Sequence, residues 1–119
     1  MDVDESVRMN MLYDFYGGLL TDRQRGMFRM YYCEDMSLSE IADELSISRQ
    51  GVHGALRKSA AALEGYESKL ELVKKFRRAE RAVLAAKDGI RTLEAERADD
   101  AALGGRLRGI RGILGGIDV

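Results

Sequence analysis

The chain has 119 residues, of which 45% are hydrophobic and 33% charged, and it lacks Pro and Trp. This length suggests one domain with at most an appendage, and the composition favours long exposed helices over sheet. The single Cys33 excludes a disulfide framework and a multi-cysteine zinc site. No apolar run is long enough to cross a membrane and no signal peptide opens the chain, so we expect a cytoplasmic protein without membrane insertion.

The formal net charge of −1 hides a polarity along the chain. Residues 1–47 carry four basic and ten acidic groups, a net charge of −6. Residues 48–70 carry four basic and two acidic groups (+2), and residues 71–119 carry eleven and eight (+3). The whole-chain charge therefore does not indicate a nucleic-acid binder, and any such binding is expected in the second half.

Residues 5–16 are predicted to form the first helix, because apolar side chains recur at the spacing that gathers them on one face. The stripe comprises Leu12, Phe15, Tyr16 and Leu19. The paired glycines 17 and 18 predict the end of this helix, because glycine raises the entropic cost of continuing it.

Three later helices are predicted from their capping residues. Thr21 with Gln24, and Ser37 with Glu40, have the spacing of capping boxes, and Ser48 stands at the start of a further helix. The caps at 37 and 48 are eleven residues apart, which leaves room only for a short helix and a three-residue turn. The pattern predicts a helix-turn-helix domain over residues 1–62 with helices at about 5–16, 22–34, 38–45 and 48–62.

The remainder is predicted to be a long helix over 63–98, continuous with the fourth helix, followed by a Gly-rich tail over 99–119. The long helix has an apolar stripe that it cannot bury alone, so it must fold back on the domain or pair with a second chain. We favour a homodimer through this helix. The tail has six glycines but keeps helical spacing of its apolar residues, which indicates a marginal helix.

The helix that begins near residue 48 is a candidate recognition helix. Its inner positions are Val52, Leu56 and Ala55, and its outer positions are polar. Arginine can pair with guanine and glutamine with adenine, whereas basic residues further along suit phosphates. Two alternative interpretations are a merely polar helix face and a helix-turn-helix motif that docks protein instead of DNA. The candidate nucleic-acid-binding residues are Ser48, Arg49, Gln50, His53, Arg57 and Lys58.

A second basic run lies on the long helix and consists of Lys74, Lys75, Arg77, Arg78 and Arg81. It is either a solvated helix face, which is the more common case, or a surface that grips a nucleic-acid backbone or another partner. No residue pattern predicts a catalytic site, a metal site or a cofactor. His53 is the only histidine and lacks visible partners for such chemistry.

Residues 20–52, LTDRQRGMFRMYYCEDMSLSEIADELSISRQGV, resemble the fourth conserved region of sigma-seventy-type factors. With RMNMLYDFYGGLLTDRQ (8–24) and YYCEDMSLSEIADELSISRQGVHGALRKSAAALEGYESKL (31–70), the chain resembles the YlxM family of small bacterial helix-turn-helix proteins. The resemblance implies an all-α, sigma-region-four-like fold without catalytic activity. It also implies a role in the signal recognition particle pathway, because the family gene typically neighbours genes of that machinery.

Three functions remain open from the sequence. The first is a regulatory protein that binds DNA through the 48–58 helix, and the second is an accessory factor that engages the signal recognition particle GTPase or RNA. The third is a sigma- or anti-sigma-like transcription component. Two features depart from a promoter reader: Ser46 occupies a turn position that favours Gly or Asn, and residues 53–55 are less basic.

Overall fold

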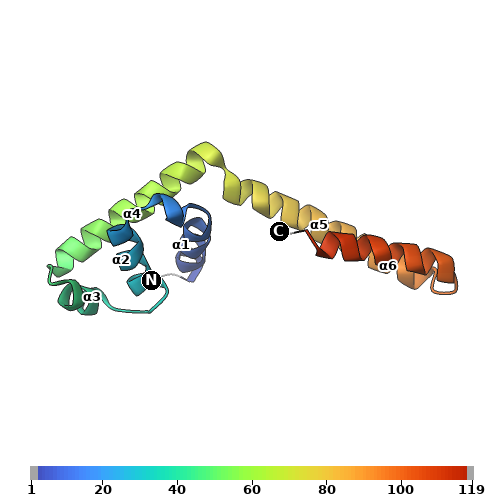
Figure 1. Cartoon of the computed structure of the whole chain (residues 1–119), viewed down its shortest axis with the longest axis horizontal. Coiled ribbons are helices and arrows are strands. Elements are labelled where there is room, and N and C mark those ends of the chain that lie inside the picture. The colour runs from blue at the N-terminus through green and yellow to red at the C-terminus, as the bar shows by residue number, and fades with distance from the viewer. Residues whose placement is uncertain (1–2, 118–119) are drawn as a thin grey trace. The chain divides into compact units, whose positions relative to one another are not determined.

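The structure is a computed structural model that describes residues 3–117. Within this range all regular structure is helical, which confirms the predicted all-α helix-turn-helix class with a long C-terminal helix (Figure 1). The elements are α1 (Val3–Tyr16), the 3₁₀ turn η1 (Gly17–Leu19), α2 (Asp22–Tyr32), α3 (Leu38–Leu45), α4 (Arg49–Leu70), α5 (Leu72–Glu96) and α6 (Ala101–Gly115).

The chain divides into two compact units, Met1–Val73 and Lys74–Val119. The first unit holds two hydrophobic clusters, and α4 contributes to both. Its first half joins α2 and α3 around Met27, Ile41 and Val52. Its second half joins α1 and α2 around Leu12, Phe28, Leu63 and their neighbours. The helix that presents the candidate site is therefore anchored along much of its length, which gives that site a rigid support.

The predicted caps form as expected. The Thr21 hydroxyl accepts a hydrogen bond from the backbone N–H of Gln24 at 3.1 Å, and the Gln24 side chain accepts one from the N–H of Thr21 at 2.9 Å. Ser37 and Glu40 make the same reciprocal pair at 3.1 and 3.0 Å. These bonds satisfy N–H groups that a helix start would otherwise leave unpaired, so they fix where α2 and α3 begin.

The apolar stripe predicted on the first helix is only partly correct. Leu12 and Tyr16 are buried, but Phe15 is 37% exposed and Leu19 is 58% exposed. Met9 and Leu20 are buried in this core instead. The reason is geometric: the chain leaves the α-helix at Tyr16, and η1 turns Leu20 rather than Leu19 toward the core.

The prediction of a helix that runs without interruption from the fourth helix into the long one is wrong. The chain leaves the α-helical conformation at Glu71, which has a left-handed backbone (φ 54°, ψ 31°), between α4 and α5. Two polar side chains hold the new helix start. The Tyr16 hydroxyl accepts a hydrogen bond from the N–H of Leu72, and the Glu67 carboxylate accepts one from the N–H of Val73, both at 3.0 Å.

In the second unit, α6 lies back along α5 (Figure 1). Leu107 of α6 is only 6% exposed. The Arg111 Nε lies 3.3 Å from the Glu94 Oε1 of α5. The Asp100 carboxylate caps α6 by accepting a hydrogen bond from the N–H of Leu103 at 3.0 Å. The Gly-rich tail is therefore a helix docked on the long helix. Its six glycines lower its intrinsic helix stability, and packing on α5 compensates for this loss.

Candidate nucleic-acid interface

The turn between α3 and α4 sets the direction of the candidate recognition helix. Ser46 ends α3 in a left-handed conformation (φ 56°, ψ 43°). The N–H of Ile47 then donates to the carbonyl of Ala42 at 3.1 Å, the long-range bond of a Schellman cap. Ile47 also packs against the cluster of Ile41 and Val52. The predicted left-handed turn at position 46 is thus present without a glycine, and packing of Ile47 helps hold it.

The start of α4 is capped by Ser48, whose hydroxyl accepts a hydrogen bond from the N–H of Gly51 at 2.9 Å. A side chain at position 51 would be crowded, because an added Cβ would lie 3.1 Å from the Ser48 Oγ. The inner face of the helix is apolar: Val52 is fully buried and Leu56 is 7% exposed. Cap and core together determine which face of α4 is presented to solvent.

All six candidate contact residues of α4 are exposed: Ser48, Arg49, Gln50, His53, Arg57 and Lys58. At about 100° of rotation per residue, Arg49, Gln50, His53 and Arg57 share an arc of about 100° that runs from Arg49 to Gln50. Lys58 lies about 80° beyond Gln50. The structure therefore brings four of the six onto one strip and places Lys58 at its flank. The strip begins at the helix N-terminus, which itself carries partial positive charge.

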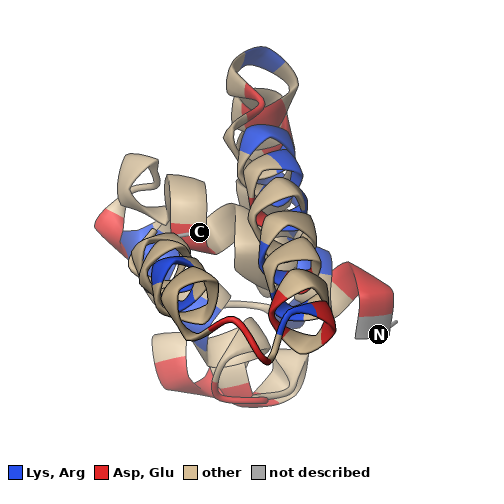
Figure 2. Cartoon of the chain, turned by 90° about the vertical axis from the view of Figure 1, so that its right-hand side faces the viewer, with Lys and Arg blue, Asp and Glu red and all other residues tan. Residues whose placement is uncertain are grey.

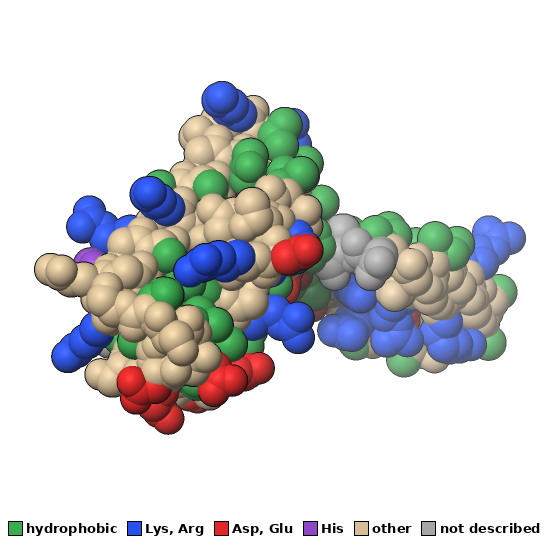
Figure 3. Space-filling view, turned by 60° about the vertical axis from the view of Figure 1, so that its left-hand side comes forward, with side chains coloured by type: hydrophobic (Ala, Val, Ile, Leu, Met, Phe, Trp, Pro, Cys, Tyr) green, Lys and Arg blue, Asp and Glu red, His purple; other side chains and the backbone are tan. Residues whose placement is uncertain are grey.

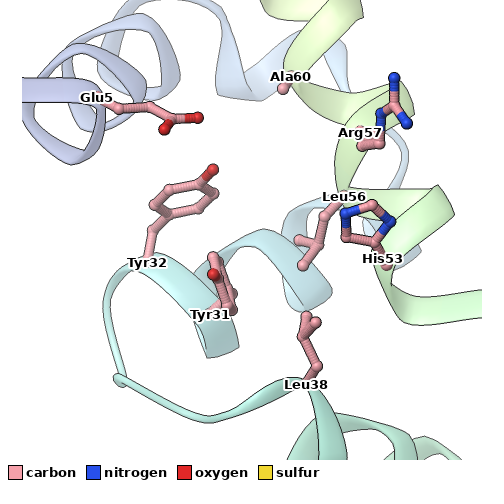
Figure 4. Close-up of a pocket in the computed structure, with 8 residues that line it drawn as sticks. All are labelled: Glu5, Tyr31, Tyr32, Leu38, His53, Leu56, Arg57 and Ala60. Atoms are coloured by element: carbon pink, nitrogen blue, oxygen red, sulfur yellow. The ribbon is translucent and has the colours of Figure 1, made fainter. Parts of the chain in front are cut away.

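A cavity of about 160 Å³ opens beside this strip, and His53 and Arg57 form part of its wall (Figure 4). Its other lining residues are Glu5, Tyr31, Tyr32, Leu38, Leu56 and Ala60. Burial raises the pKa of the Tyr32 phenol, and the nearby Glu5 carboxylate raises it further. No periodic pattern predicts this cavity, because its lining residues come from four separate helices.

The electrostatics of the first unit oppose indiscriminate nucleic-acid binding. Residues 1–73 carry eight basic and thirteen acidic groups, a net charge of −5. Acidic side chains gather together in Figure 3, while several basic side chains project away from them. The first turn of α4 contains no acidic residue. A polyanion would therefore meet no like charge from the first turn of α4 itself.

The second predicted basic set, Lys74, Lys75, Arg77, Arg78 and Arg81, lies in the first three turns of α5, and all five residues are exposed. The structure also reveals a basic group that sequence reasoning overlooked, on the later part of α5 and on α6. The overlooked residues are Lys87, Arg91, Arg108 and Arg111, which line a common cleft. One available signal was that residues 101–115 hold three arginines and no acidic residue.

Among residues 3–117, no group of three or more His, Cys, Asp and Glu side chains is placed to hold a metal ion. Over the same part of the chain, none of the helices has the length and apolar character needed to span a membrane.

The short capped α3, the left-handed turn at Ser46 and the exposed polar strip of α4 define a helix-turn-helix protein. A family model described as "Putative helix-turn-helix protein, YlxM / p13 like" matches residues 3–99. The chain belongs to this family, UPF0122, which confirms the resemblance to YlxM proteins.

Relatives of known sequence agree with this membership. A UPF0122 protein of Caldanaerobacter subterraneus subsp. tengcongensis is 58% identical over 72 residues, which cover 60% of this chain and 62% of that protein. The match thus spans less than two thirds of that relative. A UPF0122 protein of Thermoanaerobacter sp. (strain X514) is 44% identical over 100 residues, 84% of this chain and 86% of the relative.

Proposed function

We propose that the chain is a non-enzymatic, cytoplasmic helix-turn-helix protein that binds DNA through the exposed strip of α4 and acts as a regulatory component of the signal recognition particle pathway. The observation that carries the DNA-binding part is the contrast between the two faces of α4. Val52 and Leu56 are buried, whereas Arg49 and Gln50 are exposed in its first turn. Base contacts in this motif come mainly from the N-terminal residues of the recognition helix. The pathway assignment rests on the family resemblance.

The roles of the strip residues follow from their chemistry. Arg49 and Gln50 would read base edges, because their side chains form bidentate hydrogen bonds with guanine and adenine. Arg57 and Lys58 lie two turns further along and would contact phosphates, which adds affinity without sequence information. Ser48 caps the helix and would remain near the backbone of the DNA, while His53 would border the groove.

The proposal is tested by selecting bound sequences from a random duplex DNA library with the purified chain. Enrichment of a common site, lost in Arg49→Ala/Gln50→Ala and kept in Arg23→Ala, would support base reading by α4. Arg23 is a suitable control because it is an exposed arginine on α2, outside the strip. Recovery of sequences no different from the input library would contradict the DNA-binding part of the proposal.

The second candidate function is a protein- or RNA-binding accessory factor of the signal recognition particle GTPase that does not bind DNA. The net charge of −5 on residues 1–73 favours it, since this charge opposes DNA binding by the same unit. In this case the exposed basic set between Lys74 and Arg81 would contact the partner. Nuclease-resistant recovery of the purified GTPase on the immobilised chain, unchanged by Arg49→Ala/Gln50→Ala and reduced by Lys75→Glu/Arg78→Glu, would favour this function.

We also propose that the chain forms a homodimer through α5. Leu84 is 52% exposed and Leu93 is 38% exposed, so the docking of α6 leaves apolar surface on α5. Dimers also suit helix-turn-helix proteins that read paired half-sites. Light scattering coupled to size-exclusion chromatography gives the mass directly, and Leu84→Glu should shift it from dimer to monomer. A monomeric mass for the unmodified chain at high concentration would contradict the dimer.

A further inference from the structure

A cleft of about 370 Å³ within the second unit is lined almost entirely by cations. Its walls are Lys87 and Arg91 from α5, and Arg108, Arg111 and Gly112 from α6. Figure 2 shows blue bands on both helices of this hairpin. Four cations around one cleft repel one another, and such an arrangement is stabilised when an anion enters.

The carboxylates around the cleft neutralise only part of this charge. Arg111 pairs with Glu94, their Nε and Oε1 atoms lying 3.3 Å apart. Arg91 lies 3.7 Å from Asp88, and both side chains are more than half exposed, so this pair is weak. Lys87 and Arg108 have no carboxylate within salt-bridge distance among residues 3–117. The four cations and two carboxylates leave a local net charge of +2.

The cleft has room for a phosphoryl group. Gly112 leaves its wall open, since an added Cβ would meet no atom within 4 Å. The volume is enough for about a dozen water molecules, so a phosphoryl group can enter with part of its hydration shell. Arginine guanidinium groups bind phosphate oxygens through paired hydrogen bonds, and lysine adds a mobile point charge.

We propose that the cleft between Lys87 and Arg108 is a binding site for phosphate oxygens, supplied either by an RNA strand or by a small polyphosphate. The site lies in the second unit and is separate from the DNA-binding strip proposed on α4. It also differs from the basic set between Lys74 and Arg81, because none of those residues lines the cleft. The chain would thereby carry a second anion-binding surface.

Two probes distinguish the sources of phosphate on the full chain. Inorganic pyrophosphate represents small polyphosphates, and a 20-nucleotide polyuridine represents an RNA backbone. Either probe should shift the backbone amide resonance of Gly112 saturably in two-dimensional NMR spectra. Tighter binding of polyuridine identifies RNA as the source, and tighter binding of pyrophosphate identifies small polyphosphates. If neither probe shifts the Gly112 resonance, the proposal is wrong.

Matched variants test whether the cleft itself binds. Lys87→Gln/Arg108→Gln removes the two cations without carboxylate partners, and Arg97→Gln/Arg106→Gln removes the same charge outside the cleft. The first variant should weaken binding of the effective probe at least tenfold, and the second less than threefold. With polyuridine, the slope of log affinity against log salt concentration should become shallower by about 1.4 in the first variant, at about 0.7 per lost phosphate contact.

Equal weakening by the two variants would overturn the proposal, because it would indicate only diffuse attraction to a basic surface. Circular dichroism of both variants checks that α6 remains helical. The variant Arg49→Ala/Gln50→Ala should bind both probes like the unmodified chain. Failure of the phosphate site and failure of DNA binding by α4 are therefore observed separately.

Discussion

The Tyr16 hydroxyl donates a hydrogen bond to the Glu67 carboxylate over 2.6 Å, although 51 residues separate them in the sequence. The same two oxygen atoms accept the N–H groups of Leu72 and Val73, which begin α5. The end of α1 and the end of α4 thus jointly determine where the long helix starts. Burial, and then the bond to Glu67, raise the pKa of the Tyr16 phenol. The hydroxyl therefore stays protonated and able to donate.

Substitution Tyr16→Phe should lower the free energy of unfolding by about 1–2 kcal/mol, because it removes a donor to a charged group and an acceptor for the Leu72 N–H. Urea unfolding gives the free energy, and hydrogen exchange should accelerate at Leu72. Tyr66→Phe is the matched control, since the Tyr66 ring lies 6.0 Å from the Tyr16 ring. Equal destabilisation by both substitutions would mean that the hydroxyl of Tyr16 has no special role.

Substitution Ser46→Gly should raise the free energy of unfolding by about 0.5–1 kcal/mol. Ser46 has φ 56°, a backbone conformation that is strained for a side chain and free for glycine. Thermal unfolding followed by circular dichroism measures the effect. Ser39→Gly, within α3, should instead be destabilising, because glycine loses more entropy in a helix. A loss of stability in both variants would contradict the proposed strain at position 46.

The ion pair between Arg8 and Glu64 should make a small, pH-dependent contribution to stability. The hydrogen bond from Arg8 lowers the pKa of Glu64 from its ordinary value of 4.5. A lowered folded-state pKa stabilises the fold at pH values above 4.5, and this stabilisation is lost as the pH falls through the folded pKa. Since both side chains are more than 40% exposed, the contribution should be no more than about 1 kcal/mol.

Urea unfolding of the chain and of Arg8→Gln between pH 7 and pH 3 tests this pH dependence. The free energies of unfolding of the two proteins should differ at neutral pH and converge toward pH 3. Arg23→Gln is the control, because it removes an exposed positive charge on α2, whereas the ion pair of Glu64 is with Arg8. A constant difference across the whole range would show that the pair does not depend on ionisation of Glu64.

Substitution Gly109→Ala should increase the helix content of the second unit and stabilise α6 by about 0.5–1 kcal/mol. An added Cβ there would meet nothing within 4 Å, so only the entropy changes. Gly17→Ala, in the first unit, should instead lower the free energy of unfolding, because its Cβ would lie 3.0 Å from the Tyr13 ring. Circular dichroism and thermal unfolding compare the two. Destabilisation by Gly109→Ala would mean that α6 needs the small residue for packing.

Substitution Lys58→Gln should weaken DNA binding modestly and equally for all sequences, with the salt slope falling by about 0.9. Arg49→Ala should instead lower affinity most for the selected site, because it removes a base contact worth about 1–3 kcal/mol. Fluorescence anisotropy on selected and scrambled duplexes separates the two effects. Lys69→Gln, near the other end of α4, is the charge control. Loss of sequence preference in Lys58→Gln would contradict its assignment to phosphate.

Local chemistry explains what the sequence could predict. Capping boxes at Thr21 and Ser37 depend on residues three positions apart, so they could be recognised without tertiary information. The same holds for the left-handed turn at Ser46 and for the inner face of α4 at Val52. These short-range rules were sufficient for the helix-turn-helix class, and the exposed strip of Arg49, Gln50, His53 and Arg57 was predicted from the same periodicity.

The break at Glu71 and the docked tail were decided by tertiary structure. No residue between 60 and 97 is a proline or an obvious cap, so local propensity favoured one continuous helix. Tyr16, distant in sequence, supplies part of the cap that allows the chain to turn. Likewise, Lys87 and Arg108 line one cleft only because α6 packs on α5, where Leu107 is buried. The sequence determined the capped helices and the inner face of α4, and long-range packing determined where the long helix begins and which charges share a cleft.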